Sequence, residues 1–176
     1  MTPSQFFSLA IPAAIQGGHI WPDYAACEAA EESTHRDDPS NWALSKLAIQ
    51  GNNLFGMKAP SHPPEGWAYP TLDLPTYEVV GGEEVAVAHQ FWPIFPDWAT
   101  AFKERMALLR RLSVYAPALA ASSGPAFVVA VSKVWATDPN RAANVLAIMA
   151  DNAVLVGSIM KAAEGAATLV SSGSIS

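Results

Sequence analysis

The segment Cys27-Glu28-Ala29-Ala30-Glu31-Glu32-Ser33, followed by Asn53-Leu54-Phe55-Gly56-Met57-Lys58-Ala59, is the most informative part of this chain. The first stretch is alanine-rich and predicts a helix that carries a carboxylate near its end. The second stretch breaks its apolar run with Gly56 and predicts a loop that opens a cleft. Together they indicate an acidic side chain beside a groove.

The composition bounds the class of protein. At 176 residues the chain fits one domain with an ample core, and 51% of it is apolar. The net charge of −6 and the sequence pI near 5.1 argue against nucleic acid or an anionic membrane surface as the main partner. A neutral sugar chain needs no basic patch, so the balance permits a glycan substrate. Cys27 is the one cysteine, which excludes an intrachain disulfide, and we expect it to be buried.

The pattern along the chain predicts a mainly α (α+β) domain. Turn signals and apolar periodicity predict helices at 4–16, 22–34, 42–49 and 124–135, one beginning after Asp97, and one long helix opened by Asp138-Pro139. Two short strands, 76–80 and 83–88, flank Gly81-Gly82 and predict a hairpin. We expect the domain to span 1–163 and the small, polar end of the chain, 164–176, to be a flexible tail.

The two quoted segments resemble the glucosaminidase family of peptidoglycan hydrolases, the flagellar-rod and autolysin type. The family pattern is roughly Ala-Gln-Ala-Ala-x-Glu-Ser, a variable loop, and Asn-Leu-Phe-Gly-Ile-Lys-Ala. A third match is Trp135-Ala136-Thr137-Asp138-Pro139, where the family has Tyr-Ala-Thr-Asp-Pro. The resemblance covers about residues 4–160. It implies a lysozyme-like fold with a cleft between the helical lobe and the hairpin, and an endo-β-N-acetylglucosaminidase that cuts the glycan strand after N-acetylglucosamine.

On this resemblance Glu32 takes the position of the catalytic general acid. Its apolar neighbours and Glu28, one turn earlier, both favour the protonated form of a carboxyl group. Glu28 stands where Gln is usual, and we expect either a buried protonated acid or a polar contact to backbone. Glu31 is expected to face solvent. From the residues alone, a solvated acidic helix face is the alternative for all three.

The second carboxylate implied by the resemblance is Glu78, in Thr76-Tyr77-Glu78. It could hold the water that attacks the anomeric carbon, or it could be an ordinary exposed strand residue. The substrate's own 2-acetamido oxygen could replace it. The separation of the two carboxyl groups decides between retention and inversion, and the sequence does not set it.

Aromatic rings and amides suit the flat faces and hydroxyl rims of sugars. The resemblance places six residues at the groove: Asn53, Phe55, Lys58, Trp67, Tyr69 and Trp135. Packing of the core or of the loop is the alternative role for each aromatic residue, and an exposed or capping lysine is the alternative for Lys58. The chain departs from the family at Trp135 and at Arg141, where the family has Tyr.

Two other functions remain open from the sequence. One is a glycan-binding or structural component of a phage or secretion system that has the same fold and little or no turnover. The other is a lytic transglycosylase, which needs the Glu acid and no water-holding carboxylate. The histidines lack the spacing of metal ligands, so we expect neither metal nor cofactor; they are His19, His35, His62 and His89.

The N-terminus lacks the pattern of a secretory signal, because no Lys or Arg precedes Arg36 and Gly17-Gly18 interrupts the apolar run. No apolar stretch approaches membrane-spanning length. We expect a chain made in the cytoplasm that acts at the cell wall or periplasm after delivery by a phage or a secretion system. Its expected partner is the peptidoglycan glycan strand, with an immunity protein or delivery machinery as further candidates.

Overall fold

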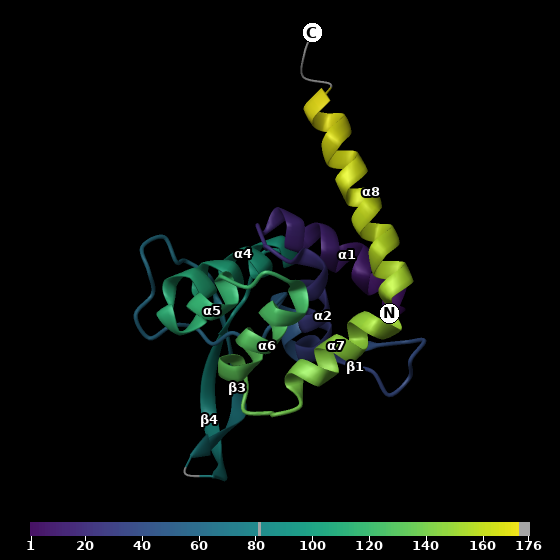
Figure 1. The fold of residues 1–176 in the computed structure, drawn as a ribbon. Coiled ribbons are helices and arrows are strands. Elements are labelled where there is room, and N and C mark those ends of the chain that lie inside the picture. The colour runs from purple at the N-terminus through teal and green to yellow at the C-terminus, as the bar shows by residue number, and fades with distance from the viewer. Residues whose placement is uncertain (81, 173–176) are drawn as a thin grey trace.

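The computed structural model describes residues 1–80 and 82–172, and the side chains of 1–77, 82–83 and 85–165. Helices gather around a central helix, and a long β hairpin and the last helix project from them (Figure 1). The predicted mainly helical class with a small hairpin is confirmed. The elements are α1 Pro3–Gln16, α2 Pro22–Ser33, β1 Thr34–His35, β2 Ala43–Leu44, α3 Lys46–Gly51, β3 Thr71–Val80, β4 Glu83–Pro93, α4 Trp98–Arg111, η1 Ser113–Tyr115, α5 Ala116–Leu119, α6 Gly124–Trp135, α7 Arg141–Asp151 and α8 Ala153–Ser172.

Helix α2 is the centre of the core. Every residue from Ala25 to Ala30 is fully buried, so the helix is covered on all sides along this stretch. Helices α1, α6 and α7 pack against it. Because most of the buried residues are alanines, the surrounding helices can approach its backbone closely.

Residues 42–49 were predicted as a helix, and that prediction is wrong over its first half. Strand β2 pairs with β1, with Thr34 opposite Leu44, and α3 begins only at Lys46. Ser45 is the N-cap, and its hydroxyl accepts a hydrogen bond from the Ala48 amide. The tertiary pairing of β1 with β2 therefore delays the start of the helix.

The hairpin is longer than the sequence predicted. β3 begins at Thr71, five residues before the predicted start at residue 76, and β4 runs to Pro93, five residues past the predicted end at residue 88. Pro75 is accommodated because the register shifts between Leu74 and Thr76, a bulge where no ladder hydrogen bond is needed. Gly81, half of the predicted turn, lies outside the described residues.

The predicted long helix after Asp138-Pro139 is two helices, so that prediction is corrected. α7 ends at Asp151, and α8 leaves it at an angle of 75°. The Asn152 amide group donates to the Ile148 carbonyl oxygen, which helps end α7. Asp138 does not cap α7; its carboxylate accepts from the Asn140 amide in the turn before the helix.

α8 remains helical to Ser172, past the predicted domain end at residue 163, while residues 173–176 of the predicted tail lie outside the described part. Within the described chain no individual helix has both the length and the apolar character to cross a membrane. α7 together with α8 as far as Gly165 meets the criterion only as a bent pair, by length and composition.

The contact between α1 and α4 sets a testable steric limit at Gly17. A Cβ atom there would lie 2.7 Å from Phe102 Cβ and 2.8 Å from the Lys103 backbone nitrogen. Since that backbone cannot swing away, we expect Gly17→Ala to lower the free energy of unfolding by about 1–3 kcal/mol. Gly157→Ala is the control, because a Cβ at Gly157 of α8 meets nothing within 4 Å. That substitution should stabilise by about 0.5–1 kcal/mol through helix propensity. Urea denaturation measures both, and equal effects would contradict the close packing.

Candidate active site

The charged centre of the molecule is Glu28 on α2, whose side chain is 0% exposed. Arg105 Nη2 from α4 donates to Glu28 Oε2 at 2.7 Å, and Arg141 Nη1 from α7 donates to Glu28 Oε1 at 3.0 Å. A buried carboxylate persists only when it is paired and hydrogen-bonded, and both conditions hold here. The expectation of a polar contact to backbone is therefore wrong, because both carboxylate oxygens accept hydrogen bonds from guanidinium groups of distant helices.

Glu32 lies one turn further along α2, near its C-terminal end. Arg141 Nε donates to Glu32 Oε1 at 2.5 Å, and the Glu32 side chain is 21% exposed. Burial raises the pKa of the Glu32 carboxyl group, and the neighbouring Arg141, although it acts in the opposite direction, does not offset that effect. The carboxyl group is thus partly buried, oriented by a hydrogen bond and still reachable from outside.

Arg141 ties the two carboxylates together from the start of α7. Its side chain is 2% exposed, and Nη1 also donates to Ser132 Oγ of α6 at 2.8 Å. One planar guanidinium group therefore contacts α2 at two positions and α6 at a third. This geometry is one that Lys could not reproduce with a single ammonium group.

Arg105 connects the charged centre to an aromatic wall. Its guanidinium carbon lies 4.5 Å from the centroid of the Phe55 ring and 4.9 Å from that of Trp135. Trp135 also contacts Phe55 and Tyr115, with ring centroids 6.3 and 6.2 Å apart. These contacts orient the Trp135 ring.

Beyond this wall lie two adjoining cavities, which we call the Met57 groove. The inner cavity, of about 300 Å³, is lined by Gly56, Met57, Lys58, Leu108, Leu112, Tyr115 and Trp135. The outer cavity, of about 200 Å³, is lined by Met57, Lys58, Ala59, Pro60, Trp67, Glu104, Leu108 and Arg111. Glu32 does not line either cavity; Arg141, Glu28 and Arg105 link it to Trp135 at the inner end.

Three of the residues predicted to bind substrate line the Met57 groove: Trp135, Trp67 and Lys58. Tyr69 supports it from outside, because its ring packs edge-on against Trp67 and its hydroxyl donates to Glu104 Oε1 at 2.9 Å. Burial and the Glu104 carboxylate raise the pKa of Tyr69 to about 12. The hydroxyl therefore stays protonated at neutral pH.

Asn53 and Phe55 lie beneath the groove. Both are about 1% exposed. The Asn53 amide donates to the Met57 carbonyl oxygen and accepts from the Met57 amide, which closes the loop that forms the floor. Phe55 packs edge-on against Phe102 and under Arg105. Their position gives these two residues the role of shaping the groove floor.

Glu31 was predicted to face solvent, and that prediction is wrong. It is partly buried, forms an ion pair with Arg36 and accepts a hydrogen bond from Asn144 Nδ2 at 2.9 Å. These contacts fix the C-terminal end of α2, where Glu32 lies. Cys27 is buried as predicted, and burial raises the pKa of its thiol, so the thiol stays protonated.

Glu78, the predicted second carboxylate, lies in the outer part of the hairpin. Its backbone pairs with Val85, close to the turn that joins β3 to β4. The hairpin extends away from the helices (Figure 1). The Glu78 side chain lies outside the described residues, so its distance from Glu32 stays open.

Arg105 and the role of Arg141 were missed from the sequence. Arg105 interrupts an otherwise apolar face of α4, where Phe102, Met106 and Leu109 are buried at helical spacing. A cation on the inward face of an amphipathic helix requires a buried acid, and Glu28 is the acid on the alanine-rich helix. The sequence therefore contained a signal for a buried ion pair, but it did not show that α4 packs with its Arg105 against Glu28 of α2.

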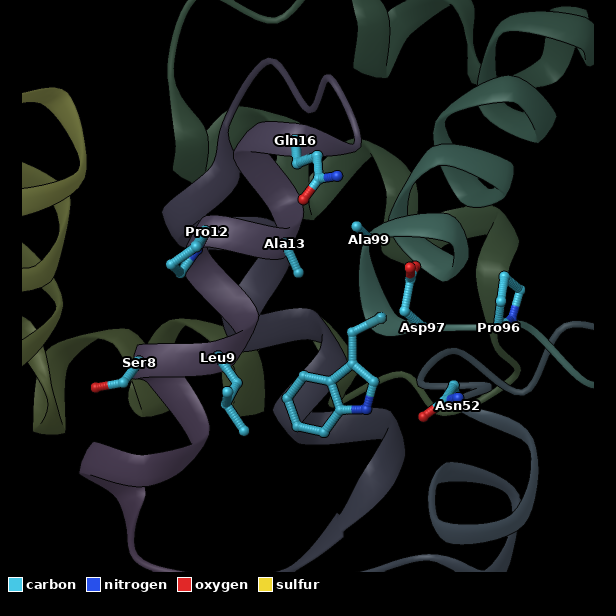
Figure 2. A pocket seen from close by; sticks show the side chains of 10 residues that line it. Ser8, Leu9, Pro12, Ala13, Gln16, Asn52, Pro96, Asp97 and Ala99 are labelled. Carbon is cyan, nitrogen blue, oxygen red and sulfur yellow. The ribbon is translucent and has the colours of Figure 1, made fainter. Parts of the chain in front are cut away.

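Another cavity, of about 460 Å³, lies between α1 and the start of α4 (Figure 2). It is lined by Ser8, Leu9, Pro12, Ala13, Gln16, Asn52, Pro96, Asp97, Trp98 and Ala99. Its acidic group, Asp97, is the N-cap of α4 and accepts from the Thr100 amide at 2.7 Å. An acid engaged in this way offers no proton donor, so we assign the chemistry to the Glu32 side of the molecule.

Comparison with known proteins gives a family match and structures with the same fold. The glucosaminidase family model, described as mannosyl-glycoprotein endo-beta-N-acetylglucosaminidase, matches residues 9–154. A search of curated proteins gives no match.

Solved structures with the same fold include a peptidoglycan hydrolase mutant from Sphingomonas sp. A1. It has a TM-score of 0.66 and 20% identity over 90% of this chain and 98% of that chain. The catalytic domain of the autolysin Auto from Listeria monocytogenes gives 0.66 and 20% over 89% of each chain. A truncated glycoside hydrolase domain of FlgJ from Salmonella typhimurium gives 0.57 and 23% over 86% of this chain and 98% of that chain.

At these identities the structures show a shared fold, and the family model shows the family. The match covers most of the chain, including both segments that carried the resemblance. The chain therefore belongs to the glucosaminidase family of glycoside hydrolases.

Proposed function

We propose that this protein hydrolyses the glycan strand of peptidoglycan, cutting after N-acetylglucosamine, with Glu32 as the general acid. Family membership supports the reaction class, and the peptidoglycan hydrolases among the structural relatives support the substrate. The observation that carries the proposal is the state of Glu32. It is a partly buried carboxyl group with a raised pKa, held in place by Arg141, whose partner Glu28 also binds the Arg105 that lies over Trp135 of the aromatic-lined groove.

The proposed step begins with a protonated Glu32. Its proton passes to the glycosidic oxygen as the bond from that oxygen to the anomeric carbon of N-acetylglucosamine breaks, and the leaving sugar departs as an alcohol. Glu32 becomes a carboxylate, which Arg141 is placed to stabilise through its 2.5 Å hydrogen bond. A raised pKa lets the protonated form that the step requires persist to higher pH than in an ordinary carboxyl group.

The positive anomeric centre is then quenched by water or by the substrate's own 2-acetamido oxygen. We propose Glu78 as the group that holds the water in the first route. The second route needs no further carboxylate, because the acetamido oxygen closes a ring that water later opens. Both routes return a reducing N-acetylglucosamine end.

Sugar binding is assigned to the Met57 groove. Trp135 lines one of its two cavities, Trp67 lines the other, and Lys58 lines both. Aromatic faces stack on the apolar faces of pyranose rings, so the groove suits a chain of neutral sugars.

A glycan-binding protein with little turnover is the second candidate function. It is favoured by the ion pair of Glu32 with Arg141, since a guanidinium group stabilises the carboxylate and opposes the acid form. Trp135 also lacks the hydroxyl of the tyrosine that the family has at this position. A lytic transglycosylase, a third candidate, would use the same acid and leave anhydro-muramic ends.

The direct test is clearing of purified cell walls by wild type and Glu32→Gln. We expect Glu32→Gln to lose on the order of 100-fold or more in rate, because Gln cannot donate a proton. Glu31→Gln is the matched control. It is the same chemical change one residue away, and Gln keeps an oxygen that can accept from Asn144, so the end of α2 stays held and we expect the rate to stay within a few-fold of wild type. Equal clearing by wild type and Glu32→Gln would remove Glu32 from the role.

The products test the bond and the chemistry. Mass spectrometry of digested muropeptides should find reducing N-acetylglucosamine ends. Reducing muramic acid ends would contradict the bond position, and anhydro-muramic ends would identify a transglycosylase. Binding to insoluble walls without new ends would support the glycan-binding alternative.

The pH dependence follows from the direction of the Glu32 pKa shift. Since the acid must be protonated, kcat/KM should fall as pH rises through the folded-state pKa of Glu32, which burial raises above its ordinary value. The protein should therefore be more active at mildly acidic pH than at alkaline pH. A rate that rises steadily from pH 5 to pH 9 would argue against a carboxyl acid.

A further inference from the structure

We propose that Arg141 is a positioning residue that fixes the Glu32 carboxyl group and opposes its protonation, and so sets the upper pH limit of the reaction. This inference rests on the proposed role of Glu32 as the acid. Arg141 lies outside the quoted motifs, and the proposal gives it control over the orientation and the protonation of Glu32.

The geometry supports a fixed position. Arg141 contacts Glu32 through Nε at 2.5 Å, and Glu28 and Ser132 through Nη1 at 3.0 and 2.8 Å. A planar group held at three points has one orientation, and the carboxylate that accepts from its Nε inherits that orientation. At 2% exposure Arg141 cannot exchange these partners for water.

The charge count supports the second part of the proposal. Glu28 and Glu32 on α2 face Arg105 from α4 and Arg141 from α7, so the cluster is neutral when all four are ionised. Tyr115 of η1 adds no charge at neutral pH, because burial raises the pKa of its hydroxyl group. Glu31 is already paired with Arg36. Protonating Glu32 therefore leaves one unbalanced positive charge in a largely buried site, which is unfavourable.

Burial makes the largest contribution to the pKa of Glu32 and raises it, and this effect is larger than the lowering by Arg141. The charge and the hydrogen bond of Arg141 lower the pKa, and the charge of Arg105 lowers it less. The charge of Glu28 makes the smallest contribution and raises it. Removing Arg141 deletes the largest opposing contributions and leaves burial in place. The acid form of Glu32 should then persist to higher pH.

The test substitutes Arg141→Gln and Arg141→Lys and follows the Glu32 carboxyl carbon by ¹³C NMR during a pH titration, with Glu32→Gln to assign the signal. In Arg141→Gln we expect the titration midpoint to rise by about one pH unit or more. The alkaline limb of kcat/KM on cell walls should move up by the same amount.

Arg141→Lys separates charge from geometry. It keeps a cation near Glu32, so the midpoint should stay closer to wild type than in Arg141→Gln. One ammonium group cannot hold both carboxylates as the planar guanidinium group of Arg141 does, so kcat should fall on the order of 10- to 100-fold. A purely structural arginine would lower stability in both variants and move neither midpoint.

Loss of Arg141 could prevent folding, because Glu28 would keep only one partner. The double variant Glu28→Gln/Arg141→Gln removes one charge of each sign and leaves Glu32 with Arg105. Its midpoint should still rise, since Arg141 outweighs Glu28 at Glu32. An unchanged or lowered midpoint in every folded variant without Arg141 would overturn the proposal.

The NMR titration needs no turnover, so the two proposals can fail separately. A raised midpoint together with a fully active Glu32→Gln would refute the role of Glu32 as general acid, and would still support the effect of Arg141 on its protonation. An inactive Glu32→Gln together with an unmoved midpoint would keep the acid and refute the role of Arg141.

Discussion

The structure depends on one interaction, the buried carboxylate of Glu28 between Arg105 and Arg141. It joins the central helix α2 to α4 and α7, which are distant in sequence, and all three side chains are sealed from water. Removing one member of such a cluster costs about 3–5 kcal/mol, because the remaining charge is left buried and unpaired. The cluster is therefore a strong constraint on how these helices pack.

The positions of Glu32 and of the aromatic wall both follow from that constraint. Arg141 is fixed by Glu28 and in turn fixes Glu32, at the point where α2 reaches the surface. Arg105 is fixed by the same carboxylate and lies over Phe55 and Trp135, which bound the inner end of the Met57 groove. Glu32 and the aromatic wall of the Met57 groove are thus positioned by opposite sides of a single buried charge.

The sequence predicted well what local signals decide. Helices α1, α2 and α6 were predicted within two residues of their ends, because Gly17-Gly18, Pro22 and Gly124-Pro125 are strong boundaries. The motif resemblance located Glu32 and the loop at Asn53, and the family match covers both. Trp67, Lys58 and Trp135, which the resemblance implied as substrate-binding, line the Met57 groove, and their role there stays a prediction.

The features that were missed depend on contacts between distant segments. Strand β2 forms only because β1 lies beside it, and the bend between α7 and α8 is not marked by Gly or Pro. The partners of Glu28 stand 77 and 113 positions away in the chain, beyond the reach of any periodicity argument. A single Glu at a position where the family has Gln indicated a polar core, but it did not indicate which cations would complete it.

The most direct test of the account is a crystal structure of Glu32→Gln with a bound oligomer of alternating N-acetylglucosamine and N-acetylmuramic acid. The account predicts sugar rings along the Met57 groove, with one ring against Trp135 and a glycosidic oxygen within hydrogen-bond distance of the residue 32 side chain. An oligomer bound only in the cavity between α1 and α4, or with its glycosidic bonds remote from residue 32, would contradict it.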